Sequence, residues 1–311
     1  QRDYGRAFQE LALANRTLPN SAEVAYLAGS IAERQSHWDD AVQNLEKAFE
    51  LDPLNPRNVA ALSLVYDLLR RYDDESALFD RAAMANPSTR NYSQLIHAQI
   101  ELERGDLKGV HSFLETLPAN YDPDGATTWT RLKLAFYERN FDEAARILAS
   151  WKKEELVGGA GTMVPVSYWE GALARFRGDS GTASAAFTRA RATIASRLAA
   201  KPDEPLLMST LGLIDAGLSR KEEAVREGRR AVELRPLTED AVDGSTVLSS
   251  LAMIYAWVGD INAAMDVLAT LAKTPGGPPF GQLKFDPDWD AVRGDPRFAA
   301  MLNELQPRTK K

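Results

Sequence analysis

The 311-residue sequence contains no cysteine, which excludes disulfide bonds and thiol catalysis. This absence suits the cytoplasm and the periplasm alike, and we favour the cytoplasm. No apolar stretch approaches the roughly 18 residues that a membrane-spanning helix needs. The N-terminus also lacks the basic and then apolar pattern of a signal segment. We therefore expect no membrane insertion.

The sequence also lacks an excess of basic residues and the short motifs of common active sites. The net charge is −7 and the pI is about 5.2, whereas a protein that binds nucleic acid needs a basic surface. No Gly-x-Ser-x-Gly, phosphate loop or His-Glu-x-x-His occurs, and the glycine-rich stretch at 158–161 lacks the Lys-Ser/Thr of a phosphate loop. These absences predict a protein that is not an enzyme and has no cofactor and no nucleic-acid partner.

The sequence does contain a repeated pair of helices, which is clearest over residues 22–55. Small residues stand where two helices have to come close, such as Gly29 on the first helix and Ala41 and Ala48 on the second. A glycine inside a helix costs about 1 kcal/mol relative to alanine, so Gly29 indicates close backbone contact. Pro53 ends the second helix, because proline cannot continue it. The stretch predicts one helix–turn–helix unit.

The same layout returns along the whole chain. The residue that opens each second helix is small in most units, and the spacings between these residues are 34, 34, 35, 34, 39, 41 and 40. The aligned residues are Ala7, Ala41, Glu75, Val110, Ala144, Ala183, Ala224 and Ala264. Such a period predicts an all-α solenoid in which each repeat packs only on its neighbours.

A 34-residue helix–turn–helix repeat of this pattern resembles the tetratricopeptide repeat (TPR) family, and the resemblance runs from Tyr4 to Leu305. It implies a right-handed α-solenoid. Residues 1–21 hold only the second helix of a truncated repeat, so we expect that the chain begins inside a longer one. The remaining divisions that we expect are an N-terminal array at 22–157, a glycine-rich hinge at 158–164, a C-terminal array at 165–273, and a linker with a capping helix at 274–311.

The C-terminal tail carries a second resemblance. Its pattern Asp286-Pro-Asp-Trp-Asp-Ala-Val-Arg-Gly-Asp-Pro-Arg-Phe is similar to the closing segment of TPR domains at the C-terminus of large bacterial signalling proteins. In those proteins the repeats follow a protein kinase, a nucleotide cyclase or a winged-helix regulator. The resemblance implies that this chain is a docking or sensor arm. The last amphipathic helix would cap the solenoid.

In the TPR family the first helices of successive repeats line a concave groove that holds a peptide or protein. Carried over repeat by repeat, the positions that face this groove include aromatic and cationic residues, which are the usual anchors of peptide recognition. They are Tyr26, Arg34, Trp129, Lys133, Tyr168, Arg175, Phe176 and Trp257. The alternative is that these side chains only pack between repeats. The carboxylate clamp of chaperone-binding members is missing, because Tyr26 and Ser30 stand where that clamp has Lys and Asn.

One loop is a candidate for metal binding. Asn120-x-Asp122-x-Asp124-Gly125 matches the first half of a calcium loop, but Arg131 stands at the twelfth position, where glutamate is needed. A turn rich in aspartate and asparagine is therefore the favoured interpretation. The three histidines lack metal-ligand spacing, and we expect no metal site: His37, His97 and His111.

The tail has its own group of carboxylates, Asp286, Asp288, Asp290 and Asp295. Paired carboxylates can act as acid and base, but no histidine or other base lies nearby in the sequence. Turn formation and N-capping of the tail helices explain these four residues better.

Three hypotheses of function follow. The leading one is a non-catalytic protein–protein interaction scaffold that binds a peptide or protein segment in its concave groove. The second is self-association into a homo-oligomer through exposed terminal repeat faces. The third and weakest is a small-molecule receptor with a cleft near residues 158–161.

Overall fold

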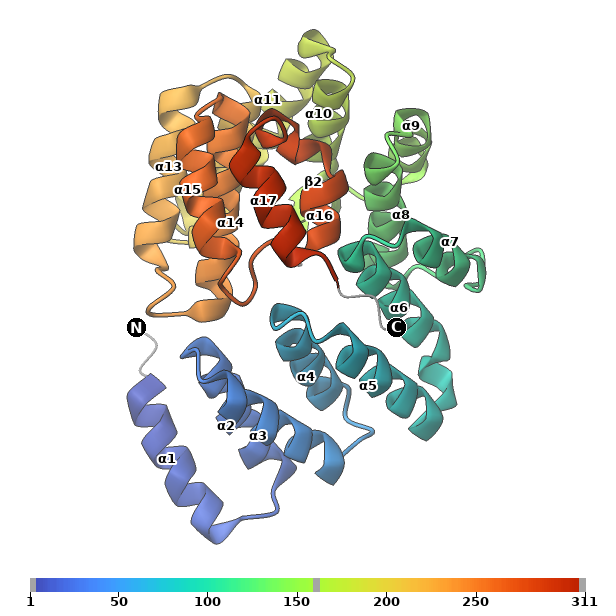
Figure 1. Cartoon of the computed structure of the whole chain (residues 1–311), viewed down its shortest axis with the longest axis vertical. Helices are drawn as coiled ribbons and strands as arrows, with labels where there is room; N and C mark the ends of the chain where they lie inside the picture. The colour runs from blue at the N-terminus through green and yellow to red at the C-terminus, as the bar shows by residue number, and fades with distance from the viewer. Residues whose placement is uncertain (1–3, 159–162, 308–311) are drawn as a thin grey trace.

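A computed structural model describes residues 4–158 and 163–307, without the side chains of residues 8, 12 and 15. These residues form stacked helix pairs, which confirms the predicted α-solenoid (Figure 1). The first helix, α1 (Tyr4–Thr17), packs on the first pair. The pairs are α2 (Ala22–Arg34) with α3 (Trp38–Leu51), α4 (Pro56–Leu68) with α5 (Tyr72–Ala85), α6 (Arg90–Arg104) with α7 (Leu107–Glu115), α8 (Ala126–Tyr137) with α9 (Phe141–Ser150), α10 (Val166–Phe176) with α11 (Ser180–Ala200), α12 (Pro205–Gly217) with α13 (Lys221–Leu234), and α14 (Ala241–Val258) with α15 (Ile261–Leu271).

One kind of turn joins the two helices of every pair. In each turn a residue adopts a positive φ, and the next N–H donates to the carbonyl five residues earlier, as His37 does to Ala32 at 2.9 Å. This is the Schellman motif, which satisfies the last carbonyls of a helix. The positive-φ residues are Ser36, Arg70, Gly105, Arg139, Gly178, Ser219 and Gly259. Each lies five residues before the residue that opens the second helix, so the predicted repeat spacings are the spacings of these turns.

The small residues of the pattern lie where helices touch. Ala41 is fully buried, and a Cβ added at Gly29 would meet Leu45 Cγ at 2.5 Å, which confirms the predicted close contact. Glu75 replaces the small residue in the next repeat and is still only 5% exposed. Ser63 faces it in the place of Gly29 and donates to its carboxylate at 2.7 Å. The small Ser63 side chain leaves room for the larger Glu75 side chain, and the hydrogen bond between them satisfies one oxygen of the buried carboxyl.

Short irregular elements lead into three of the first helices. Two single 3-10 turns, η1 (Pro87–Thr89) and η2 (Pro123–Gly125), precede α6 and α8. A hairpin of β1 (Glu155–Val157) and β2 (Met163–Pro165) precedes α10, with Leu156 paired to Val164. The sequence analysis did not anticipate these strands. Residues 159–162 of the expected hinge lie outside the described residues, and the buried core continues from α8 on one side of the hairpin to α14 on the other.

The solenoid curves until its two ends meet, and Figure 1 shows α14 returning above α2. Arg34 at the end of α2 donates to Asp240 at 3.0 Å and to Asp243 at 2.7 Å. Tyr4 on α1 donates to Asp240 at 3.1 Å as well. Asp240 is completely buried, so these contacts form a closed polar junction between the first and last repeats.

Helix α14 also corrects an expectation about apolar stretches. Among the described residues it is long and apolar enough to cross a membrane, and 67% of it is buried inside the protein. Serine and threonine interrupt its apolar residues, which is why the sequence analysis overlooked it. Its burial between α12, α13 and α15 is that of a core helix.

The C-terminal part folds back instead of only extending the stack. It consists of α16 (Phe280–Phe285), η4 (Pro287–Val292) and α17 (Pro296–Leu305), and Figure 1 shows it in the interior of the curved solenoid. Helix α17 packs on α15, as a capping helix would. Helix α16 packs on α6 and α8, on the opposite side of the solenoid. Helix α17 thus lies against the last repeat, where a cap is predicted, whereas the contacts of α16 with α6 and α8 were not predicted.

The turn residues predict how stability responds to glycine. A non-glycine residue at positive φ is strained, so we expect Ser219→Gly to stabilise the protein by roughly 0.5–1 kcal/mol, after the greater flexibility of unfolded glycine is subtracted. Gly178→Ala, where nothing would lie within 4 Å of the added Cβ, should destabilise by a similar amount. Thermal unfolding followed by circular dichroism measures both, with Ser219→Ala as the control. A lower melting temperature for Ser219→Gly would contradict the strain.

Candidate functional site

The first helices of the repeats line the concave face of the solenoid, which we call the groove. Residues 274–293 cross the groove and include α16 and η4, and we call them the groove segment (Figure 1). The groove segment contacts α6 and α8 on one side and α14 on the other. The candidate site thus already holds a peptide segment, which belongs to the same chain.

Three glycines let the first part of the groove segment run close to the helices. Gly276, at φ +77°, donates its N–H to the carbonyl of the last residue of α4 at 2.8 Å. Arg70 donates to the Gly277 carbonyl at 3.2 Å. A Cβ added at Gly281 would clash with the Leu102 carbonyl oxygen, so only glycine fits where α16 crosses α6. These backbone contacts fix the register of the groove segment.

An ion pair joins the middle of the groove segment to α8. Lys133 Nζ donates to Asp286 Oδ2, and both side chains are buried, Asp286 completely. The ammonium also lies 5.4 Å from the ring centroid of Tyr137 and 5.9 Å from that of Trp169. A buried charge costs several kcal/mol unless it is paired. Neither residue can therefore leave the other without a large penalty.

The groove segment carries a second buried carboxyl. Asp288 is buried, and its Oδ1 has no hydrogen-bond partner among the described residues. Burial, and to a lesser extent the Asp286 carboxylate, raise the pKa of Asp288 to about 8, although Lys133 and Arg175 act in the opposite direction. At neutral pH this carboxyl is therefore mostly protonated.

A third carboxylate holds the groove segment at the rim. Asp290 accepts two hydrogen bonds from Arg139, both at 2.6 Å, and one from Arg293 at 2.8 Å. Arg139 is the positive-φ residue of the turn between α8 and α9. Asp286 and Asp290 are four residues apart, and each meets a cation that α8 or its turn supplies.

Six of the eight predicted groove residues lie on α8, α10 and α14. Lys133, Tyr168 and Trp257 are buried, and Trp129, Arg175 and Phe176 are half-buried. The Tyr168 ring packs on Trp169 and Phe187, with centroids 5.3 and 6.1 Å away. The Phe176 ring packs on Phe136 and Phe141, at 5.3 and 6.2 Å. In this structure Phe176 thus packs against the preceding repeat and Tyr168 packs within its own repeat. Their role in binding a partner remains a prediction.

Arg175 differs from the other cations of the groove. Its guanidinium stacks over the Trp257 ring at 4.2 Å from the centroid. Burial lowers its pKa, although nearby Asp288 counteracts this. Among the described residues it has no carboxylate within ion-pair distance, whereas Lys133 and Arg139 are both paired.

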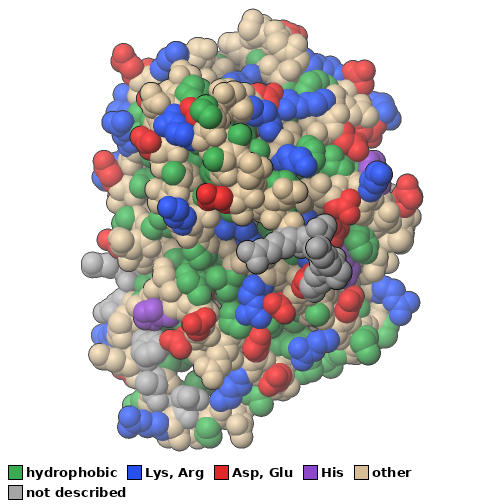
Figure 2. All heavy atoms as spheres, in the orientation of Figure 1, with side chains coloured by type: hydrophobic (Ala, Val, Ile, Leu, Met, Phe, Trp, Pro, Cys, Tyr) green, Lys and Arg blue, Asp and Glu red, His purple; other side chains and the backbone are tan. Residues whose placement is uncertain are grey.

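The remaining two predicted residues, Tyr26 and Arg34, lie on α2. Arg34 belongs to the junction with Asp240 and Asp243, so it links the two ends of the solenoid. Tyr26 is half-buried beneath the guanidinium of exposed Arg57, 4.0 Å from its ring centroid. Figure 2 shows hydrophobic side chains between charged ones in the middle of the face where the N-terminal helices meet the C-terminal half.

The prediction of N-capping aspartates in the tail is confirmed for two of them. Asp286 accepts the Asp288 N–H at 3.3 Å at the start of η4, and Asp295 accepts the Arg297 N–H at 2.9 Å at the start of α17. The sequence analysis missed the ion pairs that Asp286 and Asp290 form with α8 and its turn. The partners are 153 and 151 residues apart, and only their opposite charges hinted at the pairing.

Three of the candidate metal residues have protein partners in the structure. Asp122 accepts from the N–H of Thr128 at 3.0 Å and from its hydroxyl at 2.7 Å, which caps α8. His97 lies 3.0 Å from Asp80, and His111 lies 2.7 Å from Glu138. Within residues 4–158 and 163–307, no three His, Asp or Glu side chains are grouped to hold a metal ion.

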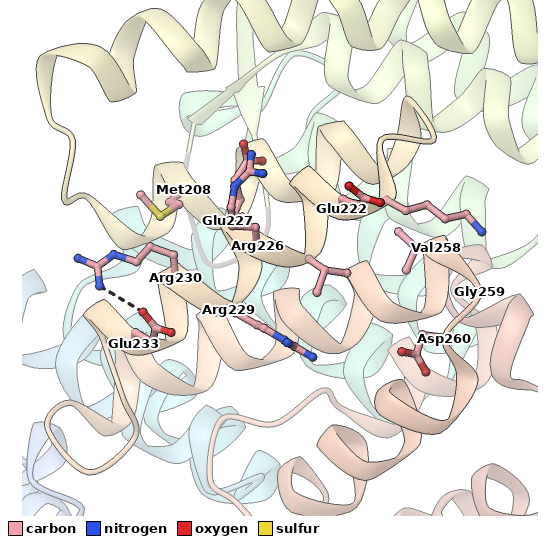
Figure 3. A pocket seen from close by; sticks show the side chains of 12 residues that line it. Met208, Glu222, Arg226, Glu227, Arg229, Arg230, Glu233, Val258, Gly259 and Asp260 are labelled. Atoms are coloured by element: carbon pink, nitrogen blue, oxygen red, sulfur yellow. Dashed lines mark hydrogen bonds and ion pairs between the residues drawn. The ribbon is translucent and has the colours of Figure 1, made fainter.

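A separate depression of about 1090 Å³ runs along α13 (Figure 3). Its floor is apolar, with Met208, Val225 and Val258, and its rim carries both basic and acidic side chains. Two of the rim arginines have partners, since Arg230 pairs with Glu233 at 3.2 Å and Arg229 donates to a tyrosine hydroxyl at 2.8 Å. The depression lies away from the residues that were predicted to line a binding site.

No protein-family model and no curated protein matches this sequence. Among solved structures, the chain is similar to a tetratricopeptide repeat protein from Parabacteroides merdae, with a TM-score of 0.51 and 14% identity over 81% of this chain and 92% of that one. It is also similar to a chain of the APC/C hetero-tetramer Cut9–Hcn1, with a TM-score of 0.49 and 15% identity over 97% of this chain and 59% of that one. The first likeness shows that the fold is that of a TPR solenoid.

The buried pair of Lys133 and Asp286 predicts non-additive substitutions. Lys133→Met leaves a buried carboxylate unpaired, so we expect a loss of about 3–5 kcal/mol of stability. Adding Asp286→Asn removes that charge, keeps an N-capping side chain, and should recover part of the loss. Arg139→Met is the control, because its pair with Asp290 is exposed and should contribute less than about 1 kcal/mol. Urea unfolding measures all four proteins, and a double variant no more stable than Lys133→Met would contradict a buried ionised pair.

The raised pKa of Asp288 predicts a dependence on pH. The unfolded carboxyl has a pKa near 4, whereas the folded one titrates at about 8, so folding favours the protonated form. Its contribution to stability is full below about pH 4 and is lost as the pH rises towards 8. As the pH rises from 5 to 8, we expect the melting temperature of the wild-type protein to fall relative to that of Asp288→Asn. Parallel melting curves for the two proteins over this range would contradict the assignment.

Proposed function

We propose that this protein is a non-catalytic scaffold that binds a peptide or protein segment in its groove. The observation that carries the proposal is the groove segment itself. Backbone hydrogen bonds, close glycine contacts and two ion pairs hold it across the first helices. A surface that binds one segment through such contacts has the chemistry to bind another. The concave face of a helical repeat array is also the usual binding surface of that architecture.

We further propose that the scaffold serves as a docking or sensor arm of a bacterial signalling protein. The support is the tail pattern from Asp286 to Phe298, whose charged and aromatic residues make specific contacts in the structure. Asp286 pairs with α8, and Trp289, Val292 and Phe298 are buried against the last repeat. A tail that must satisfy both contacts has little freedom to vary, and this supports giving weight to its likeness to the tails of signalling proteins.

Part of the groove is accessible without movement of the groove segment. At α2 and α4 the exposed Arg57 covers the half-buried Tyr26, and Arg57 pairs with Glu23 at 3.2 Å. A cation stacked on an aromatic ring is a typical anchor at a protein interface. We infer that a partner first contacts the groove at this end.

The test compares three baits in lysate of the organism that encodes the chain. The groove variant carries Tyr26→Ala and Arg57→Ala. The control variant carries Arg230→Ala on α13, whose side chain is 50% exposed against 53% for Arg57 and is likewise paired with a glutamate. We expect one protein to be retained by the wild-type and control baits and to fall at least tenfold with the groove variant. Equal recovery on all three baits would contradict docking at this end of the groove.

Self-association is the second candidate, and one observation favours it. Five of the large hydrophobic side chains that the structure shows as exposed belong to the stretch of chain from α1 through α5. They are Leu13, Leu18, Leu51, Leu54 and Met84. Light scattering of the same wild-type bait distinguishes the candidates, because a monomer at high concentration argues against a homo-oligomer formed through this surface.

A further inference from the structure

The groove segment binds through charges that the groove presents in a fixed arrangement. Lys133 projects from α8 and Arg139 from the turn that follows it, and they meet Asp286 and Asp290. The two carboxylates are four residues apart, with Asp286 at the N-cap of the short 3-10 helix η4 and Asp290 inside it. The cations belong to the groove and the carboxylates to the occupant, so the arrangement specifies the charge of whatever fills it.

We propose that the groove segment is an internal ligand, and that the partner of this scaffold is an acidic peptide segment with two carboxylates four residues apart. In the complex, the first carboxylate of the partner takes the place of Asp286 on Lys133. The second takes the place of Asp290 on Arg139. The inference rests on the proposed function and names the chemistry of the partner.

The first part of the groove segment can leave the groove while the rest of the chain stays folded. Residues 274–286 contact α4, α6 and α8, and within them Thr274–Pro279 contains two glycines and three prolines and forms no helix. At the other end of the segment, Trp289 and Val292 are buried in one cluster with residues of α14, α15 and α17. Asp290 lies between these two anchors, so its exposed side chain leaves Arg139 by rotation, without release of the backbone. The contacts to α4, α6 and α8 are therefore separable from those that anchor the tail.

The internal ligand fits the groove imperfectly. Asp288 lies between the two paired carboxylates, and its buried Oδ1 has no partner among the described residues. Arg175, on the neighbouring helix, stacks on Trp257 and has no paired carboxylate. A partner with a neutral hydrogen-bonding residue at the place of Asp288 avoids burying an unpaired carboxyl. Such a partner binds the groove more tightly than a peptide with the sequence of the groove segment does.

Tethering explains why the segment fills the groove despite this misfit. A short flexible linker gives an attached ligand an effective concentration in the millimolar range. A free peptide of equal intrinsic affinity must exceed that concentration to compete. Weakening the internal ligand by a given factor raises the apparent affinity of a free peptide by up to the same factor.

The experiment uses a fluorescent peptide with the sequence of residues 280–295 and the full chain. Binding is measured by fluorescence anisotropy to wild-type protein and to the Asp286→Asn/Asp290→Asn variant, in which the internal ligand is weakened and the groove is intact. We expect at least tenfold tighter binding to the variant. Adding Arg139→Gln to the variant should abolish most of the gain. A control peptide with asparagine at the places of Asp286 and Asp290 should bind weakly to every protein. A third peptide with asparagine only at the place of Asp288 should bind more tightly than the original.

Several outcomes would overturn the inference. If the folded double variant binds the peptide no better than wild type does, the groove segment does not compete with the peptide. If Arg139→Gln has no effect, Arg139 does not bind a carboxylate of the partner. Circular dichroism confirms that each variant is folded. Hydrogen exchange of the α16 amides in wild-type protein supplies a second measure, because excess peptide should accelerate their exchange. If the double variant instead forms a dimer without peptide, the occupant is the tail of a second copy.

The two proposals fail separately. A protein captured in a Tyr26- and Arg57-dependent manner, but not displaced by the acidic peptide, would leave the docking function intact and overturn the acidic partner. Peptide binding that depends on Arg139, together with the failure of every bait to retain a protein, would support the acidic chemistry and count against docking at the α2 end.

Discussion

The buried pair of Lys133 and Asp286 is the constraint on which the arrangement of this molecule depends. Removing both charges from water costs several kcal/mol per ion, and the attraction between them offsets that cost only in good geometry. Such a pair adds little net stability, but it penalises every arrangement in which one member is buried alone. Asp286 is completely buried, so the groove segment has one permitted position on α8. The exposed pair of Arg139 and Asp290 adds a second contact, whose contribution to stability is small.

This constraint changes the mechanics of the solenoid. In an open repeat array each repeat touches only its neighbours, and the ends are independent. Here the groove segment links the last repeat to α4, α6 and α8, and Arg34 links α2 to the start of α14. The curvature of the array is therefore fixed by contacts between distant repeats as well as by the stacking of adjacent ones. A groove closed in this way presents less open surface than the same repeats would present in an extended array.

Local rules in the sequence predicted the repeats, because both the turns and the small residues recur at fixed spacings. Even Glu75, an exception to the pattern, follows the same packing rule once Ser63 is seen to face it. The hairpin before α10 left no signal, since strands of three residues are too short to show a period. The position of the tail could not be predicted either, because its partners lie about 150 residues away and ion pairs at that separation have no periodic signature. The groove positions inferred from the family pattern fall on first helices of the repeats, and their role in binding a partner stays a prediction. They carried no information on which side chains the tail or the next repeat would bury.

Two polar groups without full pairing, Asp288 of the groove segment and Arg175 of the groove, decide how firmly the segment is held. A polar network in which every member is paired rigidifies its site, whereas a partly satisfied one loses much of that advantage. Asp288 is kept neutral by burial and still leaves an oxygen unpartnered, while Arg175 relies on the Trp257 ring instead of a carboxylate. Among the described residues, the groove segment pairs Lys133 and Arg139 with carboxylates and leaves Arg175 without one. A ligand held by two of three available cations, and opposed by one buried carboxyl, is one that a better-matched segment can replace.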